Sequence, residues 1–206
     1  MTPPDAPAPL TQTGQPGRRP VTSRAQISAV AIDLFTANGF EETSVDDVAD
    51  AAGIARRTLF RYYPSKNAIA WGDFDGHLDA MRALLADIPP TEPIADALRR
   101  ALISFNRVPP AELAGHRRRM TLLLGVPALQ AHSMLMYAEW RQVVAEFCAQ
   151  RLGLSDDDHL PQTIAWMCLG TALAAYDQWL ADPDADLETL IIAGSRTLAE
   201  GVGALS

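Results

Sequence analysis

Apolar side chains recur every three or four residues along most of this chain, and no segment alternates apolar and polar residues between turn signals. The clearest run places Ile27, Val30, Ala31, Leu34 and Phe35 on one helix face. A period of 3.6 residues is typical of amphipathic helices, whereas half-buried strands repeat every two residues. We therefore expect an all-α protein.

Local signals mark where individual helices begin and end. Ser23 and Gln26 have the spacing of a capping box, and Asn38-Gly39 is typical of a C-cap, after which Phe40 can fold back on the helix end. A second helix begins at Thr43 or Ser44 and stops near Gly53. We expect the remaining helices over residues 55–63, from 65 towards 85, and near 94–107, 111–124, 128–152, 157–180 and 187–205.

The distribution of charge separates the N-terminal third from the rest. The 206 residues carry a net charge of −8, yet the first 70 hold seven basic and seven acidic side chains, so the excess of acid lies beyond them. Between Gly53 and Trp71 there are four basic residues and no acidic one: Arg56, Arg57, Arg61 and Lys66. A basic cluster on an acidic protein favours contact with phosphate, and the alternative is a solvated basic face.

Two short helices joined by a tight, glycine-containing turn, after a longer helix, indicate a helix-turn-helix unit. On the second short helix, Leu59 and Tyr63 should face the core, while Arg57, Thr58 and Arg61 should face away from it. Arginine suits base reading because its two parallel donors match the acceptors of guanine. Thr58, Tyr62 and Lys66 suit phosphate oxygens.

The segments 43–49, 52–54 and 58–66 resemble the DNA-binding signature of TetR-family transcriptional regulators. The resemblance covers about residues 24–69 and implies a helix-turn-helix domain that binds double-stranded DNA. It also implies roles by position: Thr43 or Ser44 would touch phosphate, Arg56 and Arg57 would read bases, Phe60 would lie against the DNA edge, and Thr58, Tyr62 and Lys66 would hold the backbone.

Two positions depart from the family pattern. Phe60 stands where the family often has tyrosine, so one phosphate hydrogen bond is lost. Ala55 stands where serine or another capping residue is common, so the recognition helix lacks its usual cap. Both changes bear on affinity and sequence preference.

The C-terminal half is similar to the mycofactocin-system subgroup of TetR-type regulators, through residues 71–75, 124–132 and 137–141. This similarity implies an apolar, acyl-type effector, in a cavity among the middle helices that the TetR resemblance implies. We expect no cofactor. Lining candidates are Phe105, Leu123, Met136, Tyr137, Trp140 and Trp166, although such residues are also what cores use. The run Arg117–Arg119 is either a solvated face or an anchor for a carboxylate, phosphate or coenzyme A tail.

We expect three parts: a disordered, basic-ended arm over 1–20, the DNA-binding domain over 21–66, and an effector-binding and dimerisation domain over 67–206. Arg18 and Arg19 in the arm either enter a minor groove or only solubilise the tail. The last two helices offer apolar faces for a homodimer, and the alternative is an intramolecular core. The second face consists of Leu187, Leu190, Ile191, Gly194, Leu198, Gly201 and Leu205.

Other classes of protein find less support. The uncharged stretches 120–138 and 160–176 are interrupted by polar residues or proline, so we expect buried helices and no membrane span. Four scattered histidines and two cysteines favour neither a metal site nor a disulfide framework. The only plausible buried titratable groups for catalysis are Glu139, Tyr176 and Asp177, with no His or Cys near in sequence.

We therefore expect a cytoplasmic, homodimeric, ligand-responsive regulator, most simply a repressor that binds a palindromic operator and leaves it when the effector binds. An all-α enzyme and a helical protein-binding scaffold remain the alternatives.

Overall fold

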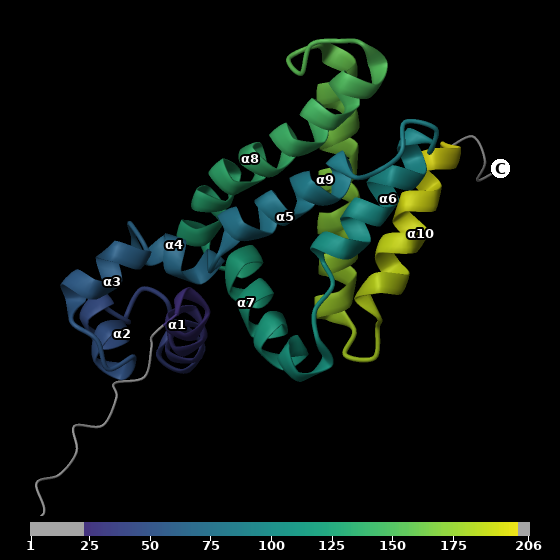
Figure 1. Ribbon diagram of the computed structural model, residues 1–206. Helices are drawn as coiled ribbons and strands as arrows, with labels where there is room; N and C mark the ends of the chain where they lie inside the picture. Colours follow the sequence, from purple (N-terminus) through teal and green to yellow (C-terminus); the bar gives the residue numbers. More distant parts are fainter. Residues whose placement is uncertain (1–22, 202–206) are drawn as a thin grey trace, which may run out of the picture.

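The computed structural model describes residues 23–201, so the predicted arm, its Arg18-Arg19 pair and Leu205 lie outside the described residues. Helices and connecting turns account for the described chain, which contains no strand, as the periodicity predicts. Figure 1 shows α1, α2 and α3 gathered at one end, with α6 and α10 at the other. The α-helices are α1 (Arg24–Asn38), α2 (Val45–Ala51), α3 (Arg56–Tyr62), α4 (Lys66–Trp71), α5 (Phe74–Ala86), α6 (Ile94–Phe105), α7 (Leu113–Gly125), α8 (Pro127–Leu152), α9 (His159–Ala181) and α10 (Leu187–Glu200).

The ends of α1 follow the local sequence signals. The Ser23 hydroxyl accepts a hydrogen bond from the Gln26 amide, and the Gln26 side chain accepts one from the Ser23 amide, which completes the predicted capping box. At the other end, Gly39 has φ +94° and Phe40 packs edge-on against Phe35, with ring centroids 4.9 Å apart. The predicted fold-back of Phe40 on the helix end is confirmed.

The expected continuous helix from residue 65 towards 85 is wrong, because the chain breaks at Gly72 into α4 and α5. Gly72 has φ +70°, and a Cβ atom there would lie 3.1 Å from Arg119 Nη1 and 3.3 Å from Ser28 Oγ. Glycine tolerates both the positive φ and this close approach. The break therefore lies where α1 and α7 meet the end of α4.

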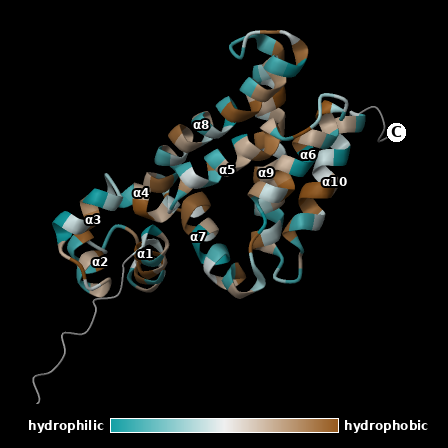
Figure 2. Cartoon of the chain, viewed as in Figure 1, coloured by the Kyte–Doolittle hydropathy of each residue, from teal (hydrophilic) through white to brown (hydrophobic). Residues whose placement is uncertain are grey.

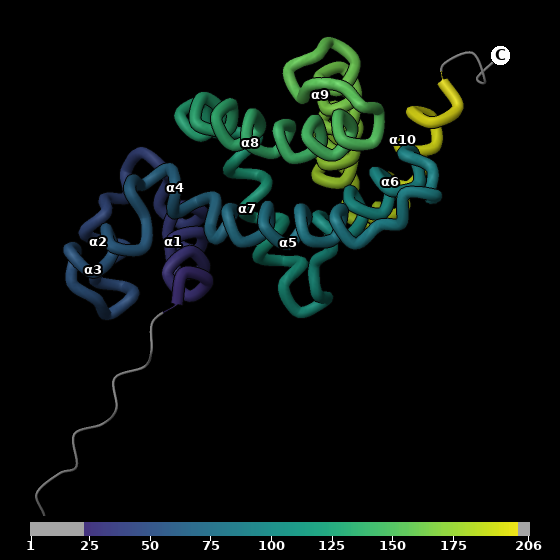
Figure 3. Tube along the Cα trace, turned by 45° about the horizontal axis from the view of Figure 1, so that its top comes forward, coloured from purple at the N-terminus to yellow at the C-terminus, as the bar shows by residue number. Residues whose placement is uncertain are grey.

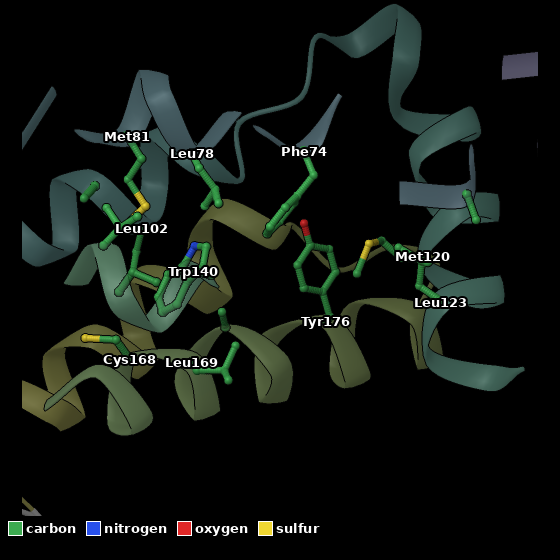
Figure 4. Packing of buried hydrophobic residues seen from close by; sticks show 14 of the residues in the cluster. Phe74, Leu78, Met81, Leu102, Met120, Leu123, Trp140, Cys168, Leu169 and Tyr176 are labelled. Carbon is green, nitrogen blue, oxygen red and sulfur yellow. The ribbon is translucent and has the colours of Figure 1, made fainter. Parts of the chain in front are cut away.

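The C-terminal helices form one packed body with a shared apolar core. Helix α9 packs against α8 and α10, while α5 packs against α6 and α8. Figure 3 shows the same arrangement from a second direction, with α2 and α3 at one end and α1 beside α4 and α7. Buried core side chains come from α5, α6, α7, α8 and α9, including Leu78, Leu102, Leu123, Trp140 and Leu169 (Figure 4).

The apolar face of α10 is used inside the chain. Leu187 and Ile191 are buried, Leu190 and Leu198 are half-buried against the core, and α10 packs on both α6 and α9. Part of this face stays accessible, so a homodimer through the last two helices remains a prediction. Further exposed apolar residues lie on α8 and α9, among them Met134, Leu160 and Met167, and Figure 2 shows hydrophobic colouring on α9. Within the described residues, no helix is long and apolar enough to cross a membrane.

Candidate DNA-binding surface and effector cavity

The turn between α2 and α3 is fixed by backbone hydrogen bonds and a positive φ. Ser44, not Thr43, caps α2, and its hydroxyl accepts from the Asp47 amide. Gly53 then takes φ +65°, and the amide of Ile54 donates to the carbonyl of Ala49 at 2.9 Å. This geometry sets the angle between the two short helices of a helix-turn-helix unit.

Helix α3 is held by one buried face. Leu59 and Tyr63 are buried as predicted, and the Tyr63 hydroxyl donates to the Arg24 carbonyl of α1 at 2.8 Å. Burial raises the pKa of that hydroxyl to about 12. Because α3 has only seven residues and Ala55 supplies no side-chain cap, its packing on α2 and the Tyr63 contact with α1 hold it in place.

The opposite face of α3 is basic and open to solvent. Arg57 and Arg61 are both exposed, and no described residue binds the Arg57 guanidinium. The Arg61 guanidinium lies 5.6 Å from the centroid of the half-buried Tyr62 ring, and Thr58 is also half-buried. Arg57 is therefore the cation on α3 that is most available for a base edge.

Arg56 and Phe60 form a small exposed cluster with α2. Arg56 Nη1 lies 2.6 Å from Asp46 Oδ2, and its guanidinium lies 5.5 Å from the Phe60 ring centroid. Phe60 itself is 41% exposed, so its ring is accessible beside the Arg56 guanidinium. Exposed ion pairs contribute little stability, so this one can exchange for a DNA contact.

Two residues that the resemblance assigns to phosphate turn inward. Thr43 is buried, and its hydroxyl donates to the Gly39 carbonyl at 2.7 Å. The Lys66 ammonium donates to the carbonyls of Phe40 at 2.7 Å and Thr43 at 3.2 Å, and lies 4.2 Å from the Phe40 ring centroid. The expected phosphate contact of Thr43 is wrong, because its side chain is buried. Lys66 holds the loop before α2. Contact of Ser44 and Lys66 with phosphate stays a prediction.

A cavity of about 740 Å³ opens between α1, which belongs to the N-terminal unit of α1–α3, and the helices from α4 to α9. Four of the six predicted lining residues do line it: Phe105, Leu123, Tyr137 and Trp140. Met136 is half-buried in the core and does not line this cavity. Trp166 is exposed on α9, where the Arg141 guanidinium lies 3.7 Å from its ring centroid.

No pattern in the sequence indicates that α1 also lines this cavity. Ala25, Ser28, Ala29 and Ile32 contribute one wall, opposite residues of α7. These residues do not belong to the apolar face that the periodicity of α1 predicts, and Ala25 and Ala29 are exposed. A cavity wall that belongs to α1 connects the cavity directly to the helix that supports α3.

A buried polar network crosses the cavity wall. The amide of Asn106 donates to the Leu102 carbonyl at 2.8 Å, and its oxygen accepts from the Tyr176 hydroxyl at 2.9 Å. Because that hydroxyl has one proton, the His116 Nε2 atom, 2.9 Å away, is the donor of their shared hydrogen bond. Burial lowers the pKa of His116 to about 4, so the imidazole is neutral at pH 7. Figure 4 shows Tyr176 pointing from α9 toward Phe74.

The residues considered for catalysis do not come together. Glu139 and Asp177 are exposed, and only Tyr176 is buried. The histidine that Tyr176 meets, His116, is 60 residues away in the sequence, so spacing could not reveal the pair. No group of three metal-ligating side chains occurs within residues 23–201.

Two family models match this chain. Residues 27–70 match the model of bacterial regulatory proteins of the tetR family, and residues 92–203 match the MftR C-terminal domain model. The first range contains the helix-turn-helix unit, and the second contains most of the cavity-forming helices.

Individual relatives agree with these matches. The chain is 50% identical over 190 residues to a protein of Mycobacterium tuberculosis (strain H37Rv) named as a mycofactocin biosynthesis transcriptional regulator, MftR, covering 92% of this chain and 96% of that protein. The fold is similar to the fatty acid degradation regulator FadR from Bacillus halodurans, with a TM-score of 0.64, 17% identity, and coverage of 87% and 100%. It is also similar to the Thermus thermophilus FadR repressor in complex with lauroyl-CoA, with a TM-score of 0.55, 23% identity, and coverage of 87% and 95%.

Proposed function

The chain belongs to the TetR family of bacterial transcriptional regulators, and we propose that it is a repressor. It binds a palindromic operator as a homodimer and releases the operator when an apolar, acyl-type effector occupies the cavity. The genes that it regulates are those of mycofactocin biosynthesis, a proposal that rests on its similarity to the relative named as a regulator of that biosynthesis. The parts are residues 21–66 for DNA and 67–206 for the effector and the dimer, with no catalytic role.

The observation that carries the DNA-binding proposal is the outward face of α3. Arg57 and Arg61 are exposed there, and no acidic residue occurs between Gly53 and Trp71. An exposed cation pays little desolvation cost and can release counterions from the DNA backbone on binding. The guanidinium of Arg57 also matches the two major-groove acceptors of guanine.

The cavity supports the effector part of the proposal. Its volume of about 740 Å³ lies within the range of small-molecule sites. Its lining combines aromatic and aliphatic side chains with polar and charged ones, which suits a ligand that has an apolar part and a polar part. The Thermus relative with lauroyl-CoA shows that one protein of this fold accommodates an acyl chain. Because α1 forms one wall, occupancy can shift the population of the N-terminal unit away from its DNA-binding position.

Selection of bound sequences from random duplex DNA by the purified protein tests the proposal. We expect enrichment of a palindrome whose half-sites lie about one helical turn, or a multiple of it, apart. Addition of lauroyl-CoA should then reduce binding to the enriched sequence in a fluorescence anisotropy titration. Failure to enrich any sequence contradicts the DNA-binding proposal, and unchanged binding in the presence of acyl-CoA contradicts this choice of effector.

For the dimer, we propose that the last two helices form the interface and that α9 supplies most of its exposed apolar surface, because Leu187 and Ile191 of α10 are buried within the chain. Leu160, Trp166 and Met167 on α9 are about half exposed, which is costly for a monomer. A second copy is the occupant that fits, because a palindromic site needs two recognition helices.

Light scattering of a Met167→Glu variant tests this surface. The variant should be monomeric and should bind the operator more weakly, whereas Ala83→Glu on the exposed side of α5 should stay dimeric. A dimeric Met167→Glu protein would contradict the proposed interface.

A further inference from the structure

Three consecutive arginines on α7 have three different environments. Arg117 donates to the Trp179 carbonyl and lies 4.0 Å from the Trp179 ring centroid, and Arg118 Nη2 lies 2.9 Å from Asp33 Oδ1. Arg119 differs from both. Its Nη2 atom donates to Ser28 Oγ at 3.0 Å, and no carboxylate of the described residues pairs with it.

Arg119 is a mostly buried cation with unused hydrogen-bonding capacity. Its Nε atom is buried and has no hydrogen-bond partner among the described residues. Burial lowers the pKa of the guanidinium below its ordinary value. A buried charge without a partner destabilises the folded protein, and a bound anion would compensate for that cost. A ligand with a negative charge therefore explains why an arginine lies here.

A second donor of the same cavity lacks an acceptor. The indole Nε1 of Trp71 is buried without a hydrogen-bond partner in the described structure. Both Trp71 and Arg119 line the cavity, together with Gly72 and Ser28. The lining combines aromatic and aliphatic side chains with further charged ones, namely Asp33, Asp73, Arg107, Glu112 and Arg118. The two unsatisfied donors lie at the junction of α1, α4 and α7.

We propose that the cavity binds an amphipathic anion, with its carboxylate or phosphate headgroup on the Arg119 guanidinium and its apolar chain against Phe74, Phe105 and Leu123. The Trp71 indole is the second donor for the headgroup. This inference rests on the proposed effector cavity and adds the chemical class of the ligand and the residue that selects it.

The position of Arg119 links the headgroup to the DNA-binding unit. Its Nη2 atom bonds Ser28 on α1, and its Nη1 atom lies beside Gly72, where α4 ends. Ser28 Oγ in turn donates to the Ile69 carbonyl of α4 at 2.7 Å. An anion that binds the Arg119 guanidinium competes with Ser28 for its hydrogen bonds. The contacts that Ser28 makes between α1 and α4 therefore depend on whether the headgroup is bound.

Titration calorimetry of the full chain with three ligands of equal chain length tests the proposal. Laurate carries a carboxylate, lauroyl-CoA carries phosphates, and 1-dodecanol carries no charge. We expect the wild-type protein to bind at least one of the anions more tightly than dodecanol. Dependence on Arg119 for laurate alone identifies a carboxylate subsite, and dependence for lauroyl-CoA alone identifies a phosphate subsite.

The variant Arg119→Met removes the charge and keeps a long apolar side chain. It should weaken binding of the preferred anion at least tenfold and leave dodecanol affinity unchanged, whereas Arg82→Met on α5, away from the cavity, should change neither. Equal loss for anion and alcohol, or no loss for either, overturns the inference while leaving an effector cavity in place. Absence of all binding to the wild-type protein overturns the cavity proposal as well.

Thermal unfolding of the unliganded proteins separates a ligand-binding role from a structural one. Removing a buried, unpaired cation should leave the Tm of Arg119→Met equal to that of wild type or raise it. A clear fall in Tm, joined to equal weakening of all three ligands, assigns Arg119 to structure and contradicts the proposal.

Discussion

The arginines of α3 and Arg119 of α7 both belong to basic runs in the sequence, yet their environments in the structure are opposite. On α3, Arg57 and Arg61 extend into solvent, where a charge is cheap to keep and free to meet a phosphate or a base. On α7, Arg119 is mostly buried beside Ser28 and Gly72, where a charge is costly and selects for an anion. Exposure, not composition, therefore separates the DNA-binding surface from the effector cavity.

The burial of His116 on α7 predicts a dependence of stability on pH. Because burial lowers the pKa of His116 from 6.5 to about 4, the unfolded chain binds a proton that the folded chain does not. Stability should be fully present above pH 6.5 and should fall by up to about 3 kcal/mol between pH 6.5 and 4. Urea unfolding of wild type and His116→Gln at pH 7 and 4.5 measures this.

The His116→Gln variant should lose less stability over the same interval, whereas His159→Gln, which changes an exposed imidazole on α9, should behave like wild type. Equal pH dependence in all three proteins would contradict the lowered pKa of His116 and would remove the contrast between α7 and the exposed face of α3.

Lys66 tests the comparison from the other side, because it belongs to the basic cluster but is used internally. Lys66→Ala removes the ammonium that binds the Phe40 and Thr43 carbonyls, and we expect a loss of about 1.5–3 kcal/mol in the free energy of unfolding. Chemical denaturation measures the loss. Arg61→Ala, on the exposed face of α3, should change stability by less than about 0.5 kcal/mol. Equal effects would mean that the two cations have the same environment.

The smallest expected effect concerns the missing cap of α3. Ala55 provides no side-chain hydrogen bond to the first turn, so Ala55→Ser should stabilise the N-terminal unit by about 0.5–1 kcal/mol. Hydrogen exchange of the α3 amides is the sensitive measurement, with Ala51→Ser at the end of α2 as the control. Unchanged exchange in Ala55→Ser would show that packing on α2 and the Tyr63 contact with α1 determine the stability of α3.

Local signals predicted much of the fold. The capping box of Ser23 and Gln26, the fold-back of Phe40 and the buried pair Leu59 and Tyr63 all depend on residues within a few positions of one another or on one helix face. Such short-range patterns can be read from sequence because the interacting groups are already neighbours.

The features that were missed depend on contacts between distant segments. The break at Gly72 follows from the approach of Arg119 and Ser28, and the inward turn of Lys66 follows from carbonyls more than twenty residues earlier. Trp166 shows the converse, since an aromatic residue at helical spacing was predicted to line the cavity but lies on the surface. Periodicity identifies an apolar face without identifying the helix that covers it.

The most direct test of the account compares wild type and Arg57→Ala on the selected operator and on a panel with each base pair of one half-site substituted in turn. Fluorescence anisotropy should show that Arg57→Ala loses about 1–3 kcal/mol per half-site on the operator and no longer discriminates at one base pair, while binding to random DNA changes little. Arg82→Ala, on α5, should retain wild-type affinity and preference. Unchanged affinity and base preference in Arg57→Ala would contradict the assignment of α3 as the helix that reads DNA.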